Sequence, residues 1–580
     1  MNCRESEDVE TRHISRRKLL GLGVKASGLL MGGSLVKSAA VAAVDSEPRM
    51  LLKNGLIVDG EGKKPFTGNV LIKGATIEDV SEGPVNVECP ALDCTGKVIA
   101  PGFIDAHSHM DWILPLQGHD ELKSPFIAQG CTTFVAGNCG FGIAGFRKPS
   151  EYKKQLTPGL FPSSELTWDT MAEYYAHLRS IGSSHNLANF AGHGTIRASM
   201  RGLNPSPLTG DEMKELLSLL EQAMEEGAAG VSLGLQYAPG IFATADEIKG
   251  VAQLVKKKDK VLAVHGRAYS SLSSEYEIKL IGPPHNLLAL QEMIGVARQT
   301  GVSLQYSHLM FAGTSSHKTY KQCLDAIDAA IAEGIDIKTD SYPYHCGNSV
   351  LSVLMPKWFR ENLPDNYHNP EALKRLETEL MALSSLVGLG YADIQITSAG
   401  HADLSRYDGM FLSEIAAARE TTPFKTYIEF AEKSGTRDTR VLLHSYSNME
   451  IIDALTQHPA CLFMTDALPG KENRNPAPYG AFPLFLQYAR ERKLIPLEQA
   501  IRKMTGATAD RFHLKNRGYL KKGMAADVTV FDWASVKDNT TIVEFDRAPT
   551  GIETVFMNGK CVLRDGKVDS PAHAGQVLSI

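Results

Sequence analysis

Two histidines near residue 108 are the first sign of chemistry in this 580-residue chain. His107 and His109 end an apolar run that begins at Val98 and is typical of a short buried strand, and Asp111 follows them. Residues two apart in a strand point the same way, so the two imidazoles project together. Converging neutral imidazoles are good metal ligands. A bare His-x-His pattern is equally compatible with two hydrogen-bonded histidines at a strand edge, so a metal site needs further ligands.

Other metal-binding side chains also follow short apolar runs. With the first pair they form a set of six candidate ligands: His107, His109, Cys139, His265, His308 and Asp466. Imidazole, thiolate and carboxylate suit zinc, and a catalytic zinc keeps one position for water. Asp466 is the candidate general acid and base, which would take the proton of that water and return it to a leaving amine. Three further cysteines are interpreted as packing residues: Cys131, Cys323 and Cys461.

Strands that alternate with helices occupy the middle of the chain. A capping box at Thr209 and Glu212 predicts a helix that ends near Gly227, and a second helix is expected over 320–333 with Ile331 facing inward. Eight apolar strand candidates end near His107, Cys139, His193, Gly234, His265, His308, Tyr342 and Asp466. Eight strand–helix units predict an α/β fold of the TIM-barrel class, whose chemistry lies at the carboxyl ends of the strands. The candidate ligands fall at those ends.

The two flanks of this middle region have a different pattern. Residues 50–97 and 526–560 are rich in short β-like runs separated by turns. We expect these distant segments to form one small sheet domain. Helical and mixed segments from about 351 to 440 are too long for a simple connection. We interpret them as an inserted subdomain between the seventh and eighth strands.

The charge of the chain bears on its partners, and its cysteines bear on whether disulfides stabilise the fold. A formal net charge of -6 over the whole chain is mild and gives no reason to expect nucleic acid or an anionic membrane surface. Nine cysteines without a Cys-x-x-Cys pair argue against a disulfide scaffold. The expected partner is a small-molecule substrate, and the sequence does not indicate an oligomeric state.

Residues 1–44 have the composition of a targeting segment rather than of a folded domain. Arg16 and Arg17 precede a modest apolar segment from Leu19 to Val44, which is interrupted by glycines and lysines and ends in small residues. This segment is too weak and interrupted for a stable membrane span. It resembles a twin-arginine export signal with an Ala-x-Ala cleavage site, so we expect export to the periplasm. An uncleaved lipid-facing anchor and a basic tail are the alternatives.

A series of motifs follows the chain in order. It begins with the stretch from Pro101 to His109 and continues with Val135–Gly140 around the cysteine, Gly192–Arg197, Gly230–Gly240, His265–Arg267, Ser307–His308, Asp340–Tyr344, Thr465–Asp466, Ala500–Thr505 and Arg517–Asp527. The first stretch resembles the first-strand signature of the amidohydrolase superfamily, and the later motifs resemble those of one family within it, the D-aminoacylase (N-acyl-D-amino-acid deacylase) family. The similarity covers about Met50 to Lys567, and the set is far more specific than His-x-His alone.

The resemblance implies a TIM barrel with a small β-sandwich domain built from both chain ends. Residues 48–98 and 510–580 would form the sandwich. Residues 99–509 would form the catalytic barrel, including the inserted subdomain at about 350–440.

The resemblance also implies how the ligands divide. Cys139, His265 and His308 would hold a tight zinc. A weaker second site would use His107, His109 and Asp466, with Cys139 as a candidate bridge. The family aspartate is the general acid and base, in agreement with the role derived above for Asp466.

Four residues are expected to contact the substrate: Tyr342, Tyr237, Asn348 and Arg474. Tyr342 matches a family residue that hydrogen-bonds the scissile carbonyl or its oxyanion, and Tyr237 matches one near the substrate. Both are equally compatible with rim aromatics. Asn348 stands where family members often have Ser.

The chain departs from the family at a basic loop residue. The family commonly has His-Pro-Arg ahead of Tyr479-Gly480, whereas Ala477 stands here in place of that arginine. If the arginine binds a substrate carboxylate, its absence puts a simple N-acyl-D-amino acid in doubt. Arg474 and Arg267 are the candidate replacements.

These patterns together predict zinc-dependent hydrolysis of a linear amide, most simply the deacylation of an N-acyl-D-amino acid by water. A cyclic-amide hydrolase of the dihydroorotase or hydantoinase type is one alternative. Such enzymes usually carry a carboxylated lysine as bridging ligand, and here Cys139 supplies a different bridge. A non-catalytic barrel scaffold is the other alternative, but such proteins lose metal ligands and this chain keeps all six candidates.

Overall fold

A computed structural model describes residues 47–153, 166–273, 275–277, 282–435, 438–470, 473–569 and 573–580. Residues 48–580 form one compact unit. The proposed export signal at 1–44 lies outside the described residues. Within them, no helix is long and apolar enough to cross a membrane.

Parallel strands form the centre of this unit. They are β6 (Phe103–Asp105), β7 (Cys131–Ala136), β8 (Asn186–Asn189), β9 (Ala191–Gly192), β10 (Gly230–Gly234), β11 (Val261–His265), β12 (Ser303–Tyr306), β13 (Ile337–Ser341) and β17 (Cys461–Phe463). One sheet has the order β6-β7-β8 and the other β17-β13-β12-β11-β10-β9. Every neighbouring pair is parallel. The predicted parallel strand–helix alternation is therefore confirmed.

The two parallel sheets join into a ring. Phe190 alone separates β8 from β9. On the other side, the backbone N–H of Ala106 donates to Phe463 O at 3.3 Å, and Ser108 forms a parallel bridge with Ala467. With β8 and β9 taken as one interrupted strand, the ring has eight strand positions in the described chain, as the sequence predicted.

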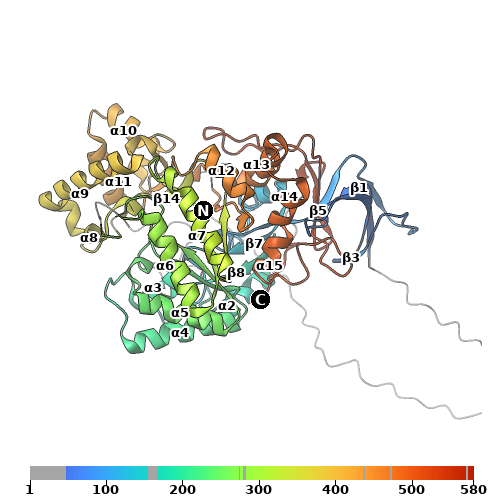
Figure 1. Cartoon of the computed structure of the whole chain (residues 1–580), viewed down its shortest axis with the longest axis horizontal. Coiled ribbons are helices and arrows are strands. Elements are labelled where there is room, and N and C mark those ends of the chain that lie inside the picture. Colours follow the sequence, from blue (N-terminus) through green and yellow to red (C-terminus); the bar gives the residue numbers. More distant parts are fainter. Residues whose placement is uncertain are drawn as a thin grey trace, which may run out of the picture. The chain divides into compact units, whose positions relative to one another are not determined.

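Helices connect the strands around the ring (Figure 1). They are α1 (Ser124–Ala128), α2 (Met171–Ile181), α3 (His193–Arg201), α4 (Gly210–Glu225), α5 (Ala245–Lys257), α6 (His285–Thr300), α7 (Tyr320–Ala332), α12 (Met449–Gln457), α13 (Ala477–Arg492), α14 (Leu497–Met504) and α15 (Gly506–Arg511). The predicted capping box is present, because the Thr209 side chain accepts from Glu212 N at the start of α4.

One detail of the helix prediction is wrong. Ile331 was expected to face inward on α7, but its side chain is 40% exposed. The buried stripe of α7 runs through Tyr320, Cys323, Ile327 and Ala330. Because the helical period is 3.6 residues, Ala330 takes the inward position and Ile331 turns away.

A nine-stranded sheet joins the two chain ends. Its strands are β1 (Arg49–Ile57), β2 (Phe66–Lys73), β3 (Thr76–Ser81), β4 (Ala91–Asp93), β5 (Val98–Pro101), β18 (Val528–Phe531), β19 (Ile552–Met557), β20 (Lys560–Arg564) and β21 (Lys567–Val568). The order is β21-β20-β19-β18-β5-β1-β2-β3, and β4 pairs with β1. The antiparallel pair β5–β18 links the N-terminal and C-terminal segments, which the sequence could only suggest.

The apolar run from Val98 to Ile104 is two strands rather than one. β5 belongs to the nine-stranded sheet and β6 to the ring, and Gly102 separates them. A Cβ at Gly102 would overlap the side chain of Thr132, so this sharp passage requires glycine. The sheet therefore extends to Pro101.

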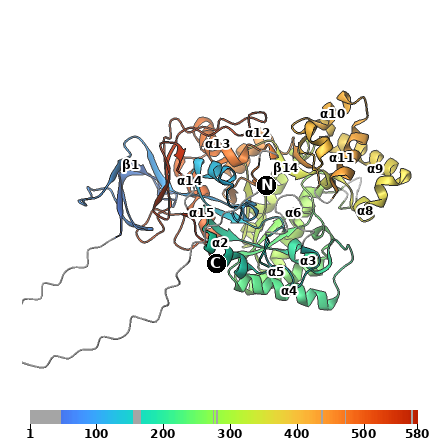
Figure 2. The same ribbon diagram turned by 180° about the vertical axis from the view of Figure 1, so that it is seen from behind.

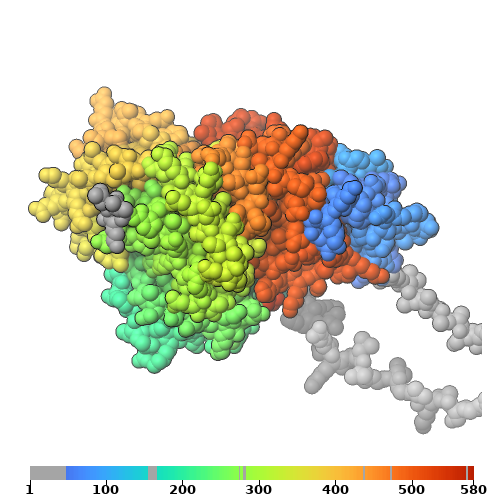
Figure 3. All heavy atoms as spheres, viewed as in Figure 1, coloured from blue at the N-terminus to red at the C-terminus, as the bar shows by residue number. Residues whose placement is uncertain are grey.

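An insert lies between β13 and β17. It contains a small antiparallel sheet of β14 (Gly347–Val350), β16 (Arg440–Leu443) and β15 (Ile394–Ser398), in that order. Its α-helices are α8 (Lys357–Arg360), α9 (Pro370–Leu383), α10 (Leu412–Ala418) and α11 (Pro423–Ser434). Figures 1 and 2 show these helices on the far side of the ring from β1 and β3. In Figure 3 the yellow atoms of the insert abut the green atoms of the ring.

Candidate metal centre

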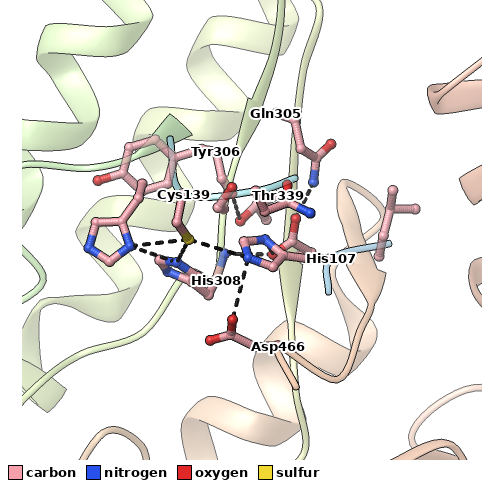
Figure 4. Close-up of polar contacts among 12 residues, drawn as sticks. His107, Cys139, Gln305, Tyr306, His308, Thr339 and Asp466 are labelled. Carbon is pink, nitrogen blue, oxygen red and sulfur yellow. Dashed lines mark hydrogen bonds and ion pairs between the residues drawn. The ribbon is translucent and has the colours of Figure 1, made fainter. Parts of the chain in front are cut away.

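The six candidate ligands come together at one end of the ring. Each follows the carboxyl end of its strand or is its last residue: His107 and His109 after β6, Cys139 after β7, His265 at the end of β11, His308 after β12 and Asp466 after β17. Figure 4 shows the sulfur of Cys139 between the rings of His107 and His308, with the Asp466 carboxylate beside His107. The site therefore lies where barrel chemistry is expected.

The Cys139 thiol is the centre of this cluster. Its Sγ lies 3.4 Å from His107 Nε2, 3.3 Å from His308 Nε2 and 3.7 Å from His265 Nδ1. Tetrahedral zinc with ordinary bond lengths separates a sulfur ligand from a nitrogen ligand by about 3.5 Å. The ligand atoms of Cys139, His265 and His308 all lie within 4.8 Å of one another, and so do those of His107, His109 and Cys139.

Electrostatics also fit a cation at this place. Burial lowers the pKa values of His107, His265 and His308, so these imidazoles are neutral and offer lone pairs at neutral pH. Burial raises the pKa of the Cys139 thiol well above its ordinary value. A thiol held among neutral imidazoles becomes a thiolate when it coordinates a cation. The donor set therefore fits zinc.

The Asp466 carboxylate defines a second group of ligands beside the first. Its Oδ1 lies 3.4 Å from His107 Nε2 and 3.5 Å from His109 Nε2. Burial alone would lower the pKa of His109, but its hydrogen bond to Asp466 and the nearby Asp111 and Asp105 raise it overall. His107 stands between the two groups, in contact with both Cys139 and Asp466.

Two buried acids support these ligands and were missed as site residues. Asp340 accepts from His308 N and from Gln305 Nε2, both at 2.6 Å, and burial raises its pKa to about 8. Asp105 accepts from His107 N at 3.2 Å, and burial raises its pKa to about 7. Partners of this kind orient metal ligands. A signal was present, since both acids stand inside motifs of the resemblance: Asp105 in the one with His107 and His109, and Asp340 in the one with Tyr342.

The backbone at the ligands is unusual. Cys139, His308 and Asp466 have φ values of 55°, 32° and 49°, in the left-handed region that L residues rarely adopt. Such strain clusters at functional sites. Next to this loop, a Cβ at Gly234 would overlap the carbonyl oxygen of Cys139, so the strand β10 can pass only because residue 234 is glycine.

A cavity of about 900 Å³ opens over the cluster between the ring and the insert. Five candidate ligands line it: His109, Cys139, His265, His308 and Asp466. Two of the predicted substrate residues, Tyr237 and Asn348, line it as well. Its size admits a small organic substrate.

The other predicted substrate residues lie elsewhere. Tyr342 does not line this cavity, but it lines a small one beside it with His308, and its hydroxyl lies 3.7 Å from Sδ of Met310, which lines both. Arg474 is also outside the lining, and its guanidinium lies over Gly409, where a Cβ would be 2.7 Å from Arg474 Cζ. Arg267 binds Glu292 at 3.0 Å. Substrate roles for Tyr342 and Arg474 stay predictions.

Two arginines that the sequence did not single out do line the cavity. Arg360 donates to Gln236 O at 3.2 Å, and Arg440 donates to Asn473 Oδ1 at 3.0 Å. Both belong to the insert, whose sequence carries no motif of the resemblance, so no signal pointed to them.

Comparison with known proteins establishes the class. The profile of the amidohydrolase family matches residues 91–362 and 409–563. The chain belongs to the amidohydrolase family.

Within that family, the chain is similar over nearly its whole folded length to enzymes acting on N-acyl-D-amino acids. The D-aminoacylase of Alcaligenes xylosoxydans xylosoxydans is 29% identical over 92% of this chain and 98% of its own. The N-acyl-D-glutamate deacylase of the same organism is 30% identical over 91% of this chain and 96% of its own. The resemblance inferred from the motifs is confirmed.

Solved structures agree. A crystal structure of a D-aminoacylase has a TM-score of 0.75 at 28% identity, over 92% of this chain and 99% of that one. The N-acyl-D-glutamate deacylase of Bordetella bronchiseptica, solved with zinc and a phosphonate inhibitor, has a TM-score of 0.74 at 26% identity with the same coverage. The amidohydrolase barrel predicted from the sequence is confirmed.

Replacing the central thiol tests the metal centre. We expect about one zinc per wild-type chain, and we expect Cys139→Ala to weaken zinc binding by at least the ~10–100-fold that even outer-sphere partners contribute. Elemental analysis after dialysis against a chelator measures the loss. Cys131→Ala is the matched control, because Cys131 is equally buried but lies at the start of β7, where its thiol donates to Thr133 O. Equal zinc retention by both variants and the wild type would contradict the assignment.

Proposed function

We propose that this protein is a zinc-dependent amidohydrolase that removes the acyl group from N-acyl-D-amino acids. One observation carries the proposal: a buried thiol, four imidazoles and a carboxylate converge at the strand ends beneath a 900 Å³ cavity. The relatives support the substrate class, since they are named D-aminoacylase, N-acyl-D-aspartate deacylase and N-acyl-D-glutamate deacylase.

Two metal positions of unequal strength are part of the proposal. Cys139, His265 and His308 would hold the tight zinc. His107, His109 and Asp466 would form the weaker position. One D-aminoacylase structure is described by one-metal activation and second-metal attenuation, which supports this division.

The chain's own residues then supply proton transfer. Bound zinc contributes Lewis acidity toward water and the scissile carbonyl. Asp466 accepts a proton from the attacking water as its oxygen bonds to the carbonyl carbon. The same carboxyl returns that proton to the nitrogen as the C–N bond breaks, which releases a carboxylic acid and an amine. His109, which contacts Asp466, helps to hold the carboxylate in place.

The residues proposed to contact the substrate differ in whether they line the cavity. Tyr237 and Asn348 line the cavity and are the favoured contacts. Arg360 and Arg440 are better placed for a substrate carboxylate than Arg474, because they line the cavity and Arg474 does not. Tyr342 lines a small neighbouring cavity together with His308, so its role toward the oxyanion is kept as part of the proposal.

The linear amide is favoured over the cyclic one. Among the described residues no lysine lines the cavity, so a carboxylated lysine has no place here. An L-hydantoinase from Arthrobacter aurescens shares the fold, with a TM-score of 0.52, but at 14% identity this likeness concerns the fold alone. A scaffold role is disfavoured because the ligands are retained.

The domain division is also a proposal. Residues 48–101 and 510–569 would form the composite β domain expected as a sandwich, and residues 347–443 a subdomain over the cavity. The sheets support this division, because β5 pairs with β18 and so joins β1–β4 to β19–β21, while β14, β15 and β16 pair among themselves. Residues 575–578 lie beside β8 instead. Amide hydrogen exchange tests this division. We expect the amides of β1 and β20 to lose protection together and separately from those of the ring. Loss of protection in β1 and β20 together with β11 of the ring would contradict the division.

A screen of enantiomers tests the activity. Zinc-loaded protein should hydrolyse N-acyl-D-amino acids and leave the L enantiomers intact, and a chelator should abolish the activity until zinc is restored. Asp466→Asn should keep its zinc and lose about 10²–10⁴-fold in kcat, since it can no longer transfer the proton. Asp403→Asn, at an exposed position, is the control. Inactivity of metal-loaded protein toward every D substrate would overturn the proposal.

Export through a twin-arginine signal is proposed from residues 1–44 alone. Replacing Arg16 and Arg17 together by lysine should leave the protein inside the cell, because the arginine pair is the defining feature of the signal. Cell fractionation measures the distribution, and Arg12→Lys is the control. An unchanged distribution would contradict the proposal.

A further inference from the structure

His265 differs from the other two imidazoles beside the Cys139 thiol in the nitrogen that it presents. Its Nδ1 lies 3.7 Å from Cys139 Sγ and 2.8 Å from His308 Nε2, whereas His107 and His308 both face the thiol with Nε2. A neutral imidazole carries its proton on one nitrogen and offers a lone pair on the other. For His265 to bind a metal through Nδ1, its proton must therefore be on Nε2.

The side chain of Gln236 holds that Nε2 atom. Gln236 Oε1 lies 3.0 Å from His265 Nε2, and an amide oxygen can only accept a hydrogen bond. The contact therefore keeps the proton on Nε2 and leaves the Nδ1 lone pair for a cation. Among the described residues, the corresponding far nitrogens of His107 and His308 are buried and have no hydrogen-bond partner. Of these three imidazoles, His265 is thus the one whose far nitrogen is held by a neighbouring side chain.

Gln236 reaches His265 because their strands are neighbours. β10 and β11 pair in parallel with Gly234 opposite His265, and the backbone N–H of Leu235 donates to His265 O at 3.0 Å. Gln236 stands two residues beyond the end of β10, and the next ring, that of Tyr237, has its centroid 4.4 Å from that of His265. His265 is buried, so water competes little for its hydrogen bond.

Arg360 holds the same loop from the insert. Its Nη1 donates to Gln236 O at 3.2 Å, and its Nη2 lies 3.4 Å from Glu275 Oε1 in the segment after β11. Both side chains of this ion pair are largely buried, with 10% of Arg360 and 8% of Glu275 exposed. A planar guanidinium fixed by one partner presents its remaining donors in defined directions. Helix α8 of the insert is therefore connected to the loop that carries Gln236.

We propose that Gln236 is a positioning residue for the zinc ligand His265, and that Arg360 keeps Gln236 in place from the insert. Gln236 does not line the main cavity, so it acts on the metal centre through His265. Partners that orient a metal-binding imidazole contribute about 10–100-fold to metal affinity. This inference rests on the zinc centre of the proposed function.

The zinc affinity of Gln236 variants tests the first part. Gln236→Met keeps the length of the side chain but removes the amide oxygen, and it should bind zinc about 10–100-fold more weakly than wild type in competition with a zinc-binding dye. Gln236→Glu keeps an acceptor oxygen and should bind zinc at least as tightly as wild type. Gln299→Met, at an exposed position of α6, is the matched control. Equal zinc affinity of Gln236→Met and wild type would overturn the proposal.

The protonated nitrogen of His265 distinguishes positioning from a merely structural role. In zinc-free protein labelled with nitrogen-15 histidine, NMR should find His265 protonated at Nε2 in wild type and in Gln236→Glu. The form protonated at Nδ1 should appear in Gln236→Met, and His265→Asn assigns the signal. Lower stability of Gln236→Met with the protonated nitrogen and the zinc affinity both unchanged would contradict the positioning role. Gln236→Leu repeats both measurements if Gln236→Met folds poorly.

A double-mutant cycle tests the contribution of the insert. Arg360→Lys keeps a positive charge beside Glu275 but loses the guanidinium fork. It should weaken zinc binding in the wild-type background and have no further effect in Gln236→Met, because both residues act through the same contact with His265. If Arg360→Lys raises KM and leaves the zinc affinity unchanged, Arg360 serves the substrate alone and the second part of the proposal falls.

Activity measured on the same proteins separates this proposal from the deacylase function. If Gln236→Met loses zinc affinity but wild type hydrolyses no N-acyl-D-amino acid, the positioning role stands and the deacylase function falls. If wild type hydrolyses these substrates and Gln236→Met binds zinc like wild type, the positioning role falls and the function stands. Wild-type protein that binds no zinc would overturn both.

Discussion

The metal centre depends on the seam where the last strand of the ring meets the first. There the Asp105 carboxyl accepts hydrogen bonds from the backbone N–H and the hydroxyl of Thr465, and from the backbone N–H of His107. Complete burial disfavours its charge, and these three donors offset part of that cost. Across the same seam, Asp466 N donates to His107 O at 3.0 Å. Two motifs 360 residues apart in the chain thereby become one site.

Three of the candidate ligand residues near that seam have unfavourable backbone dihedral angles. A left-handed backbone at a residue other than glycine costs on the order of 1–3 kcal/mol. Cys139, His308 and Asp466 all carry it, and the rest of the fold must supply the difference. For His308 the compensation is visible, because its N–H is held by the buried Asp340 carboxyl. The backbone at these three residues therefore contributes directly to where the thiol, the imidazole and the carboxylate lie.

Most of the ring and all six candidate ligands could be predicted from the sequence, because each ligand has a local signal: an apolar run that ends in a polar side chain. Parallel strand geometry then brings such ends together without further information. The substrate side of the site was less predictable. The substrate role expected for Arg474 stays a prediction: its guanidinium lies over Gly409 in the insert, outside the cavity lining, whereas Arg360 and Arg440 line the cavity. The directions of these arginine side chains are set by long-range packing, and no motif of the resemblance marks them. Ile331 is a similar case within a helix. The apolar pattern of α7 did not show that Ala330, and not Ile331, is the buried residue.

The passage through Gly102 has a mechanical consequence. A single residue connects β5 of the nine-stranded sheet to β6 of the ring, and five positions later the chain reaches His107. With no linker at this joint, the first two candidate ligands are connected closely to the sheet as well as to the ring. The insert is different, because it leaves the ring after β13 and returns before β17 through longer connections. The position of the insert depends on those two longer connections, whereas the position of His107 and His109 depends on a joint of one residue.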